Sequence, residues 1–262
     1  MSEVLLVERR GAVAEVVMHR PDKGNALDTA LKQALVETLH AVGSDDAVRA
    51  VLLSGAGPAF CVGQDLGELV EALERDPVSA ADTVEAHFNP ITDSLATMPK
   101  PVVAAVHGTC VGAGLGFALA CDVQVWAAGA TLATAFSGVG LTCDSGLSAT
   151  LARSVGLSRA RSLVLLGDVF TPEEGVAWGL AGEVLPADEV LARARALAER
   201  LAAGPTTAYA MSKRLLADAL GAPMAAVLAA EARGQRTCAA TDDHLAAVRA
   251  FVGREKPVFV GR

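Results

Sequence analysis

Two apolar runs in this chain each end in small residues and lead into a helical pattern. One is AVLLSGAGPAFCVGQDL (residues 50–66), and the other is KPVVAAVHGTCVGAGLGFALACD (residues 100–122). Each predicts a buried strand that ends at a glycine-bearing turn, around Gly63 and Gly112, followed by a helix. The first N–H groups of such a helix lack partners, and the helix dipole adds positive potential there. Two such turns facing each other predict a site that holds an oxyanion between backbone donors.

The rest of the pattern predicts an α/β core followed by helices. Strands are expected at 3–7, 13–18, 49–53, 102–106, 123–126 and 131–136, alternating with helices near 65–75, 80–97 and 112–121. This alternation favours parallel strands joined by helical crossovers. Beyond residue 146 the pattern predicts helices at 146–166, 172–180, 187–203, 206–220, 222–239 and 242–252. We therefore divide the chain into an α/β core, 1–186, and a helical region, 187–262, which either contacts other subunits or covers its own core.

Composition excludes several classes of protein. Hydrophobic residues make up 52% of the 262 residues, which is enough for a sizeable core, and the net charge is −8 with scattered basic residues, which argues against a nucleic-acid partner. The apolar runs stop short of the ~18 residues of a membrane span, and the N-terminus lacks a signal-peptide pattern. The five cysteines form no CxxC pair, so we expect neither a metal site nor disulfides, and a cytoplasmic location.

The second turn matches none of three known glycine-containing motifs. A dinucleotide fingerprint fails because Phe117 stands where the third glycine of G-x-G-x-x-G belongs. Neither a phosphate-binding Gly-Lys-Ser/Thr nor a G-x-S-x-G nucleophile motif occurs in these turns. A structural alternative stays open, in which the glycines serve only close packing of helix on strand.

Four segments together resemble the crotonase superfamily of enoyl-CoA hydratases and isomerases. They are NAL at 25–27, FCVGQDL at 60–66, HGTCVGAG at 107–114 and FVGREKPVFVGR at 251–262. The resemblance covers essentially the whole chain. It implies a spiral of ββα units with an all-helical C-terminal trimerisation region, and an acyl-CoA thioester as substrate, so that coenzyme A is not a separate cofactor. It also implies a homotrimer or a dimer of trimers; membrane and nucleic-acid partners are not expected, on the composition given above.

The resemblance assigns roles to particular residues. The two oxyanion donors are the backbone N–H groups of Gln64 and Ala113, which need no particular side chain. Coenzyme A is gripped by the first turn region and by a C-terminal tail that often comes from a neighbouring subunit. The corresponding residues here are Lys23, Asn25, Ala26, Leu27, Asp65, Leu66, Lys256 and Phe259. The two lysines also fit ordinary solvated surface charges.

The departures from the family pattern bear on the reaction. Hydratases of the family use two glutamates, and the corresponding positions here are Gly116 and, nearby, Phe136. Without a base for water and an acid for the α-carbon, ordinary hydration is not expected. Instead, Asp144 lies in the segment GLTCDSGLS at 140–148, which resembles the turn that carries the acid in isomerases of the phenylacetate-degradation branch. The alternative for Asp144 is a helix cap near Gly146.

A single aspartate suffices for a double-bond shift, because it can take a proton from C2 and return it to C4. Apolar neighbours of Asp144 would desolvate it and make it more basic than in water. We therefore expect a 3-enoyl-CoA to 2-enoyl-CoA isomerase or a related ring-epoxide acyl-CoA isomerase. A hydratase with atypical residues and a catalytically vestigial CoA-binding homologue remain alternatives. His107 is expected to stabilise its turn, and Glu71 and Glu74 to be exposed. His87 is expected to be a satisfied surface histidine, with lining of the acyl pocket as the alternative.

Overall fold

The main sheet of the protein has six strands and is parallel except at one edge. The computed structural model describes residues 4–262, so residue 3 of the predicted first strand lies outside it. The strand order is β1 (Leu5–Arg10), β2 (Val13–Met18), β3 (Ala50–Gly55), β5 (Val102–Val106), β7 (Val123–Ala127) and β9 (Glu183–Leu185). Strands β1 and β2 form an antiparallel hairpin, and the other pairs are parallel. The short β9 is absent from the sequence prediction.

A second sheet lies beside the ends of the first. It consists of β4 (Ala59–Cys61), β6 (Thr109–Val111) and β8 (Leu132–Ala133), all parallel. Each follows a strand of the main sheet, so that β3, β4 and α2 (Leu66–Arg75) form one unit, and β5, β6 and α4 (Ala113–Ala120) form the next. These repeated ββα units form the spiral that the family resemblance implied.

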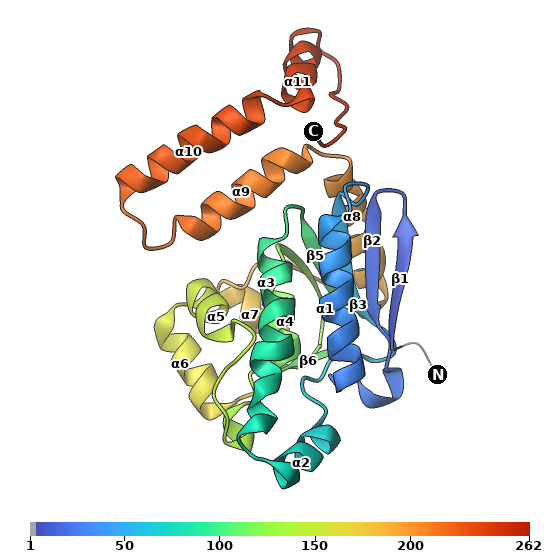
Figure 1. The fold of residues 1–262 in the computed structure, drawn as a ribbon, viewed down its shortest axis with the longest axis vertical. Helices are drawn as coiled ribbons and strands as arrows, with labels where there is room; N and C mark the ends of the chain where they lie inside the picture. Colours follow the sequence, from blue (N-terminus) through green and yellow to red (C-terminus); the bar gives the residue numbers. More distant parts are fainter. Residues whose placement is uncertain (1–3) are drawn as a thin grey trace.

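Helices cover the two faces of the main sheet (Figure 1). On one face α1 (Thr29–Ser44), α3 (Asn89–Thr97) and α4 enclose the larger part of the core, with Leu31, Leu35 and Leu39 of α1 fully buried. On the other face α8 (Ala187–Ala202) contributes a stripe of small and β-branched residues. These are Val190, Ala194, Ala198 and Ala202, which pack on residues of β2, β3, β5 and β7. The four-residue spacing keeps them on one side of the helix.

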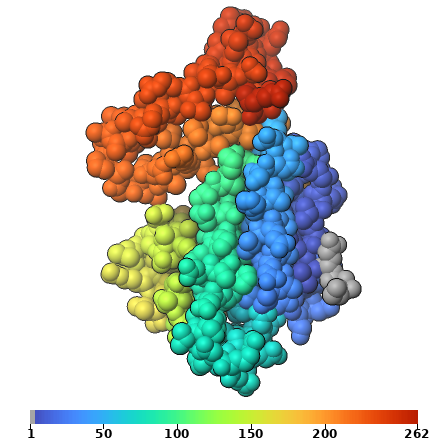
Figure 2. Space-filling model, in the orientation of Figure 1, coloured from blue at the N-terminus to red at the C-terminus, as the bar shows by residue number. Residues whose placement is uncertain are grey.

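Helix α8 therefore belongs with the core, although the sequence division at 186/187 assigned it to the C-terminal region. The projecting helices begin after Gly204 and Pro205, with α9 (Thr206–Asp218), α10 (Met224–Ala239) and α11 (Asp242–Val252). Figure 2 shows these three helices as a lobe that stands off the core, with a hollow between it and the helices around residue 150.

Several shorter elements connect the core. They are η1 (Pro21–Lys23), η2 (Ser79–Ala81), the π-helical turn η3 (Val84–Phe88), η4 (Ser137–Val139), α5 (Leu147–Val155), α6 (Leu157–Leu166) and α7 (Pro172–Trp178). The helix predicted over 146–166 is broken at Gly156, which has φ +79°. A residue in this left-handed region ends one helix and begins the next.

Within residues 4–262, we find no helix with both the length and the apolar character needed to cross a membrane.

Candidate active site

The first glycine turn aims the amide of Gln64 away from its strand partner. The N–H of Leu27 donates to the carbonyl of Gly63 (2.8 Å), and the N–H of Asp65 donates to the carbonyl of Leu27 (3.2 Å). Because the groups on both sides of Gln64 face Leu27, the N–H of Gln64 faces the opposite way. Gly63 permits this turn with φ +84°.

The second turn supplies a matching donor at the start of α4. Gly112 has φ +55° and is the N-cap, so Ala113 is the first helical residue, and its N–H has no acceptor within the helix. A β-carbon placed on Gly63 would lie 3.2 Å from the carbonyl oxygen of Val111 and 3.6 Å from the amide nitrogen of Ala113. The two turns are therefore in contact. Such a pair of backbone donors suits a developing oxyanion.

Asp144 lies on the loop that leads into α5 (Leu147–Val155). A β-carbon on Gly116 would come within 2.5 Å of Cβ of Ser145 and 2.6 Å of its carbonyl oxygen. The loop thus rests directly on Gly116, three residues after Ala113. Ser145, the residue after Asp144, therefore lies against the same helix that begins with the Ala113 amide.

The same contact excludes a side chain at residue 116. Real β-carbons essentially never approach other atoms this closely. One of the atoms in the way is the backbone carbonyl oxygen of Ser145, which can move only if the loop moves. A glutamate at 116, as in the hydratase pattern, is incompatible with this position of the loop. Phe136, the second such position, is apolar and 8% exposed. The loop with Asp144 can take this position only because residue 116 has no side chain.

The carboxyl group of Asp144 is half-buried and does not cap a helix. The N-cap of α5 is Gly146, with no side-chain cap bond, so the capping alternative for Asp144 finds no support. Its Oδ1 accepts one hydrogen bond, from the Ser145 hydroxyl at 2.8 Å. Burial raises the pKa of Asp144, and the Ser145 bond offsets only part of that rise. A carboxylate with raised pKa is a better base than an exposed one.

A buried polar atom lies next to this loop. The hydroxyl oxygen of Thr92, on α3, is buried and has no hydrogen-bond partner among the described residues. Its methyl carbon would be 3.2 Å from a β-carbon on Gly146. Buried hydroxyls are usually bonded, so this unpaired oxygen is an exception next to the loop that carries Asp144.

Some of the residues predicted to bind coenzyme A are buried and hold the first turn in shape, and others are exposed. Asn25 is fully buried and donates to the carbonyls of Ala56, Ala59 and Phe60, while fully buried Leu27 pairs with the Gln64 turn. Both hold the turn in shape. Lys23 and Leu66 are exposed, and Ala26 is buried. These three are the members of the first turn region that remain candidates for direct contact.

Asp65 links this region to α2. Its carboxylate is the N-cap, accepting from the N–H groups of Gly67 (3.0 Å) and Glu68 (3.3 Å), and it pairs with Arg20 at 3.0 Å. Burial raises the pKa of Asp65, but these bonds outweigh burial, so the net shift is downward. Asp65 thus stabilises the start of α2 and holds the side chain of Arg20.

The tail residues Lys256 and Phe259 lie far from the turns within one chain. The Arg49 guanidinium donates to the carbonyl of Phe259 (2.9 Å), and Arg49 immediately precedes β3. The Gln64 turn follows the opposite end of β3. The tail therefore lies at the amino ends of the strands, away from the oxyanion turns of its own chain.

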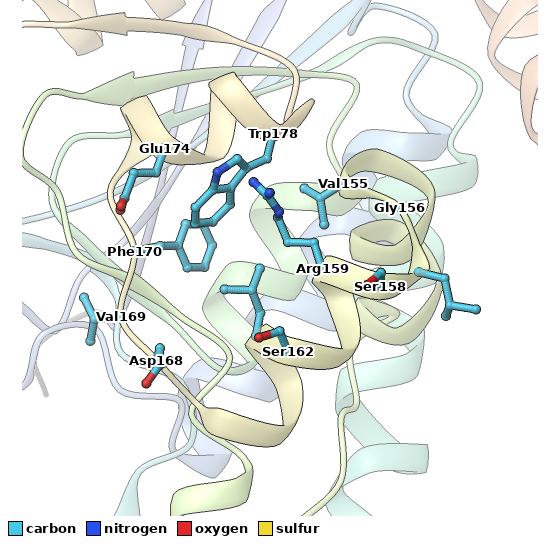
Figure 3. Close-up of a pocket in the computed structure, with 12 residues that line it drawn as sticks. Val155, Gly156, Ser158, Arg159, Ser162, Asp168, Val169, Phe170, Glu174 and Trp178 are labelled. Atoms are coloured by element: carbon cyan, nitrogen blue, oxygen red, sulfur yellow. The ribbon is translucent and has the colours of Figure 1, made fainter.

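Two cavities lie away from the candidate residues. One of about 740 Å³ opens between α5, α6 and α7, where the Arg159 guanidinium lies 4.5 Å from the Trp178 ring centroid, with Phe170 beside that ring (Figure 3). The other, of about 450 Å³, is lined in part by His107, whose Nε2 is 2.8 Å from the carbonyl of Gly57. That bond fits the predicted turn-stabilising role of His107. Neither lining includes Gln64, Ala113 or Asp144.

Sequence reasoning missed a buried lysine beneath the first turn. Lys32 of α1 is 1% exposed, and its Nζ lies 3.0 Å from Glu68, 2.9 Å from Thr83 and 3.4 Å from the side-chain oxygen of Gln64. A signal was present, because Lys32 falls three and seven residues before Leu35 and Leu39, on their buried stripe.

Comparisons with known proteins place this arrangement in a family. The model of the family "Enoyl-CoA hydratase/isomerase" matches residues 8–262. The chain is 34% identical over 266 residues to the 1,2-epoxyphenylacetyl-CoA isomerase of Escherichia coli (strain K12), covering 100% of both chains. It is 32% identical over 262 residues to the 2,3-dehydroadipyl-CoA hydratase of the same strain, again covering 100% of both.

A solved structure agrees with these relatives. A crystal structure from Mycobacterium abscessus, assigned to the enoyl-CoA hydratase/isomerase class, matches with a TM-score of 0.95 and 47% identity, over 98% of this chain and 100% of that one. The chain belongs to the enoyl-CoA hydratase/isomerase family, whose substrates are acyl-CoA thioesters. The predicted crotonase fold is confirmed. Because both isomerases and hydratases are among the relatives, the reaction has to be argued from the site.

Proposed function

We propose that the protein is an acyl-CoA double-bond isomerase that converts 3-enoyl-CoA to 2-enoyl-CoA with Asp144 as the proton carrier. The observation that carries the proposal is the contact of Ser145 with Gly116. It brings the loop of Asp144 against the position where a hydratase has a glutamate, which supports Asp144 as the acid. The nearby amides of Gln64 and Ala113 complete a site for enolate chemistry.

The proposed reaction needs one acid–base group. The thioester oxygen accepts hydrogen bonds from the N–H groups of Gln64 and Ala113, which stabilise the negative charge when a proton leaves C2. The Asp144 carboxylate takes that proton, and the electrons delocalise into the C3–C4 double bond as a dienolate. Returning the proton to C4 gives the conjugated product. No bond to water forms and no separate cofactor enters the scheme.

A ring-epoxide acyl-CoA isomerase is the second candidate. The 1,2-epoxyphenylacetyl-CoA isomerase covers the full length of this chain at 34% identity. Opening and rearranging such a ring also develops charge next to a thioester and uses proton transfer. The hydratase alternative is supported by a relative of equal coverage. In this chain, however, the Ser145 contact leaves no space for a glutamate at residue 116.

The remaining proposals concern binding and assembly. Lys23, Ala26 and Leu66 would contact coenzyme A from the same chain, and Lys256 and Phe259 would do so from a neighbour in a homotrimer or a dimer of trimers. We place the enzyme in the cytoplasm, with neither a membrane nor a nucleic acid as partner. Each of these is independent of the choice between isomerase and hydratase.

The test supplies 3-trans-enoyl-CoA and 2-trans-enoyl-CoA separately, and follows conjugation by ultraviolet absorbance and hydration by mass. We expect migration of the double bond and little addition of water. Rapid hydration of the 2-enoyl substrate would contradict the proposal in favour of an atypical hydratase. Failure of both substrates and of a ring-epoxide acyl-CoA, with acyl-CoA still raising the melting temperature, would favour the vestigial homologue.

A further inference from the structure

The thiol of Cys61 lies inside the first glycine turn and packs against the second one. Cys61 is the last residue of β4 and is fully buried. Its Sγ accepts a hydrogen bond from the N–H of Gly63 at 3.4 Å, and its S–H donates to the carbonyl of Asn25 at 3.3 Å. A thiol has one weak donor and is a weak acceptor, so both capacities of Cys61 are used.

The bond from Gly63 to the thiol fixes one side of the residue that directs the Gln64 amide. The carbonyl of Gly63 is bonded to the N–H of Leu27 at 2.8 Å, which holds the peptide plane after Gly63. The N–H of Gly63 belongs to the plane before it, and Cys61 holds that plane. In a trans peptide the C=O and N–H groups point in opposite directions, so the N–H of Gln64 points away from Leu27. This direction is kept only while both planes beside Gly63 stay in place.

The same side chain contacts the helix that carries the second donor. A β-carbon on Gly114 would lie 2.8 Å from Cβ and 3.0 Å from Sγ of Cys61. Gly114 directly follows Ala113, the first residue of α4. The side chain of Cys61 therefore separates the two turns and touches each within one residue of its donor. A change in this side chain reaches both amides.

The surroundings of Cys61 keep the sulfur protonated. Burial raises the pKa of Cys61 to about 12, and the bond from Gly63 offsets only part of that rise. The group is thus a neutral thiol at pH 7, which can donate to Asn25 and accept from Gly63 at the same time. Asn25 is itself held by three bonds from its side chain to backbone carbonyls. The thiol is therefore tied to a fixed acceptor.

We propose that Cys61 is a positioning residue of the oxyanion site, whose thiol holds the amides of Gln64 and Ala113 at the spacing that a thioester oxygen requires. It acts through Gly63 and Gly114 and does not touch the substrate. The inference rests on the enolate site of the proposed function. It does not depend on the choice between isomerase and hydratase, because both reactions place negative charge on the thioester oxygen.

The first test measures how strongly the full-length protein polarises a bound thioester. Hydrogen bonds to a carbonyl lower its stretching frequency, so infrared spectra of bound butanoyl-CoA, labelled with ¹³C at the carbonyl, report on the two donors without any reaction. We expect a lower frequency on the wild type than in water, and a return toward the value in water in Cys61→Ala. Cys61→Ser should keep the lowered frequency, because its hydroxyl also donates and accepts. A wild-type frequency in Cys61→Ala would overturn the proposal.

Cys121→Ala is the matched control for the loss of a buried thiol. Cys121 lies at the end of α4 opposite to Ala113, and its S–H donates to the carbonyl of Phe117 at 3.2 Å. This variant should lower the melting temperature and leave the carbonyl frequency unchanged. Equal frequency changes in both alanine variants would reduce Cys61 to general packing and overturn the assignment. If Cys61→Ala does not fold, a folded Cys61→Ser whose bound carbonyl absorbs as in water would overturn it equally.

The second test separates turnover from binding. On 3-trans-enoyl-CoA, Cys61→Ala should lower kcat about tenfold, part of the ~100-fold scale of one lost oxyanion donor. The affinity for butanoyl-CoA should change less than about twofold, because the donors matter most when charge develops on the oxygen. Cys61→Ser should recover most of kcat. A loss of affinity with unchanged kcat would contradict a positioning role at the oxyanion site.

A failure of the proposed isomerase reaction stays distinguishable. If the wild type does not turn over 3-enoyl-CoA, the infrared comparison decides alone. A lowered carbonyl frequency that is lost in Cys61→Ala and kept in Cys61→Ser would keep the assignment while the isomerase falls. A wild-type carbonyl that absorbs as in water would remove the oxyanion site, and the assignment of Cys61 with it.

Discussion

At the scale of single residues, the site depends on one missing side chain. Gly116 gives Ser145 the space in which the Asp144 loop rests, with only 2.5 Å between Cβ of Ser145 and a β-carbon at 116. Gly116 replaces the glutamate of the hydratase pattern, and it is also the residue that leaves space for the loop of Asp144, the proposed acid.

Gly116→Ala should therefore displace the Asp144 loop. We expect kcat for the isomerisation to fall ~10–100-fold, because small misplacements of catalytic groups are costly, and stability to fall by about 1–3 kcal/mol from overpacking. Gly138→Ala is the matched control, since a β-carbon there meets nothing within 4 Å. Steady-state kinetics and thermal unfolding check both variants, and an active Gly116→Ala would contradict the steric account.

The raised pKa of Asp144 predicts two pH effects. The base must be ionised, so kcat/KM should fall as pH drops through the raised pKa of Asp144, above the usual value near ~3.9. A raised folded pKa favours the native state at low pH, and this contribution is lost as pH rises through it. At pH 7 Asp144→Asn should therefore be at least as stable as the wild type. A markedly lower melting temperature would contradict the desolvated environment.

At the scale of elements, the C-terminal tail is fixed by one buried carboxylate. Asp243, 3% exposed in the first turn of α11, accepts from the N–H groups of Val260 (2.6 Å) and Gly261 (2.8 Å). The carbonyl of Phe259 is bonded to Arg49. These bonds set the position of the tail that we propose to close over coenzyme A.

Asp243→Ala should release the tail. We expect loss of hydrogen-exchange protection at residues 260–261, a stability loss of about 2 kcal/mol from two charge-assisted bonds, and weaker binding of acyl-CoA. Asp242→Ala, an exposed neighbour in the same helical turn, is the control. Unchanged exchange at 260–261 in Asp243→Ala would show that the tail is held in another way.

The elements also show where sequence reasoning succeeds. The strand at 102–106 and the helix that begins at 172 are predicted correctly, because local chemistry decides them; the helix begins at a capping box with Thr171. The three-residue β9 and the break at Gly156 were missed, because β9 depends on pairing with β7 and a single glycine is a weak signal. In the site, the positions of Gln64, Ala113 and Asp144 came from the family resemblance. The spacing of Lys32 from Leu35 and Leu39 indicates its burial, but no local pattern predicts its contacts with Glu68 and Thr83, which lie far along the chain.

At the scale of the whole molecule, apolar side chains remain uncovered on the projecting lobe. They include Leu216, Leu220, Met224, Leu228, Leu245, Val248, Phe251 and Val252. An apolar surface of this kind is characteristic of a contact with another protein. Together with the position of Lys256 and Phe259, it supports the proposed assembly of copies.

Light scattering should give three or six times the chain mass of 26.7 kDa. Leu216→Glu, at a position 74% exposed in the single chain, should shift the assembly toward monomers, because a charge buried without a partner is costly. Gln235→Glu, on the exposed side of α10, adds the same charge and should leave the mass unchanged. A wild type that is monomeric at all working concentrations would contradict the assembly.

The most direct test of the central claim compares Asp144→Asn with the wild type on 3-trans-enoyl-CoA, with acyl-CoA affinity measured on the same samples. The account predicts a fall in kcat of at least ~100-fold, the scale of a lost general acid–base group, with nearly unchanged affinity. A variant that keeps full activity would show that Asp144 does not carry the proton, and would contradict the account.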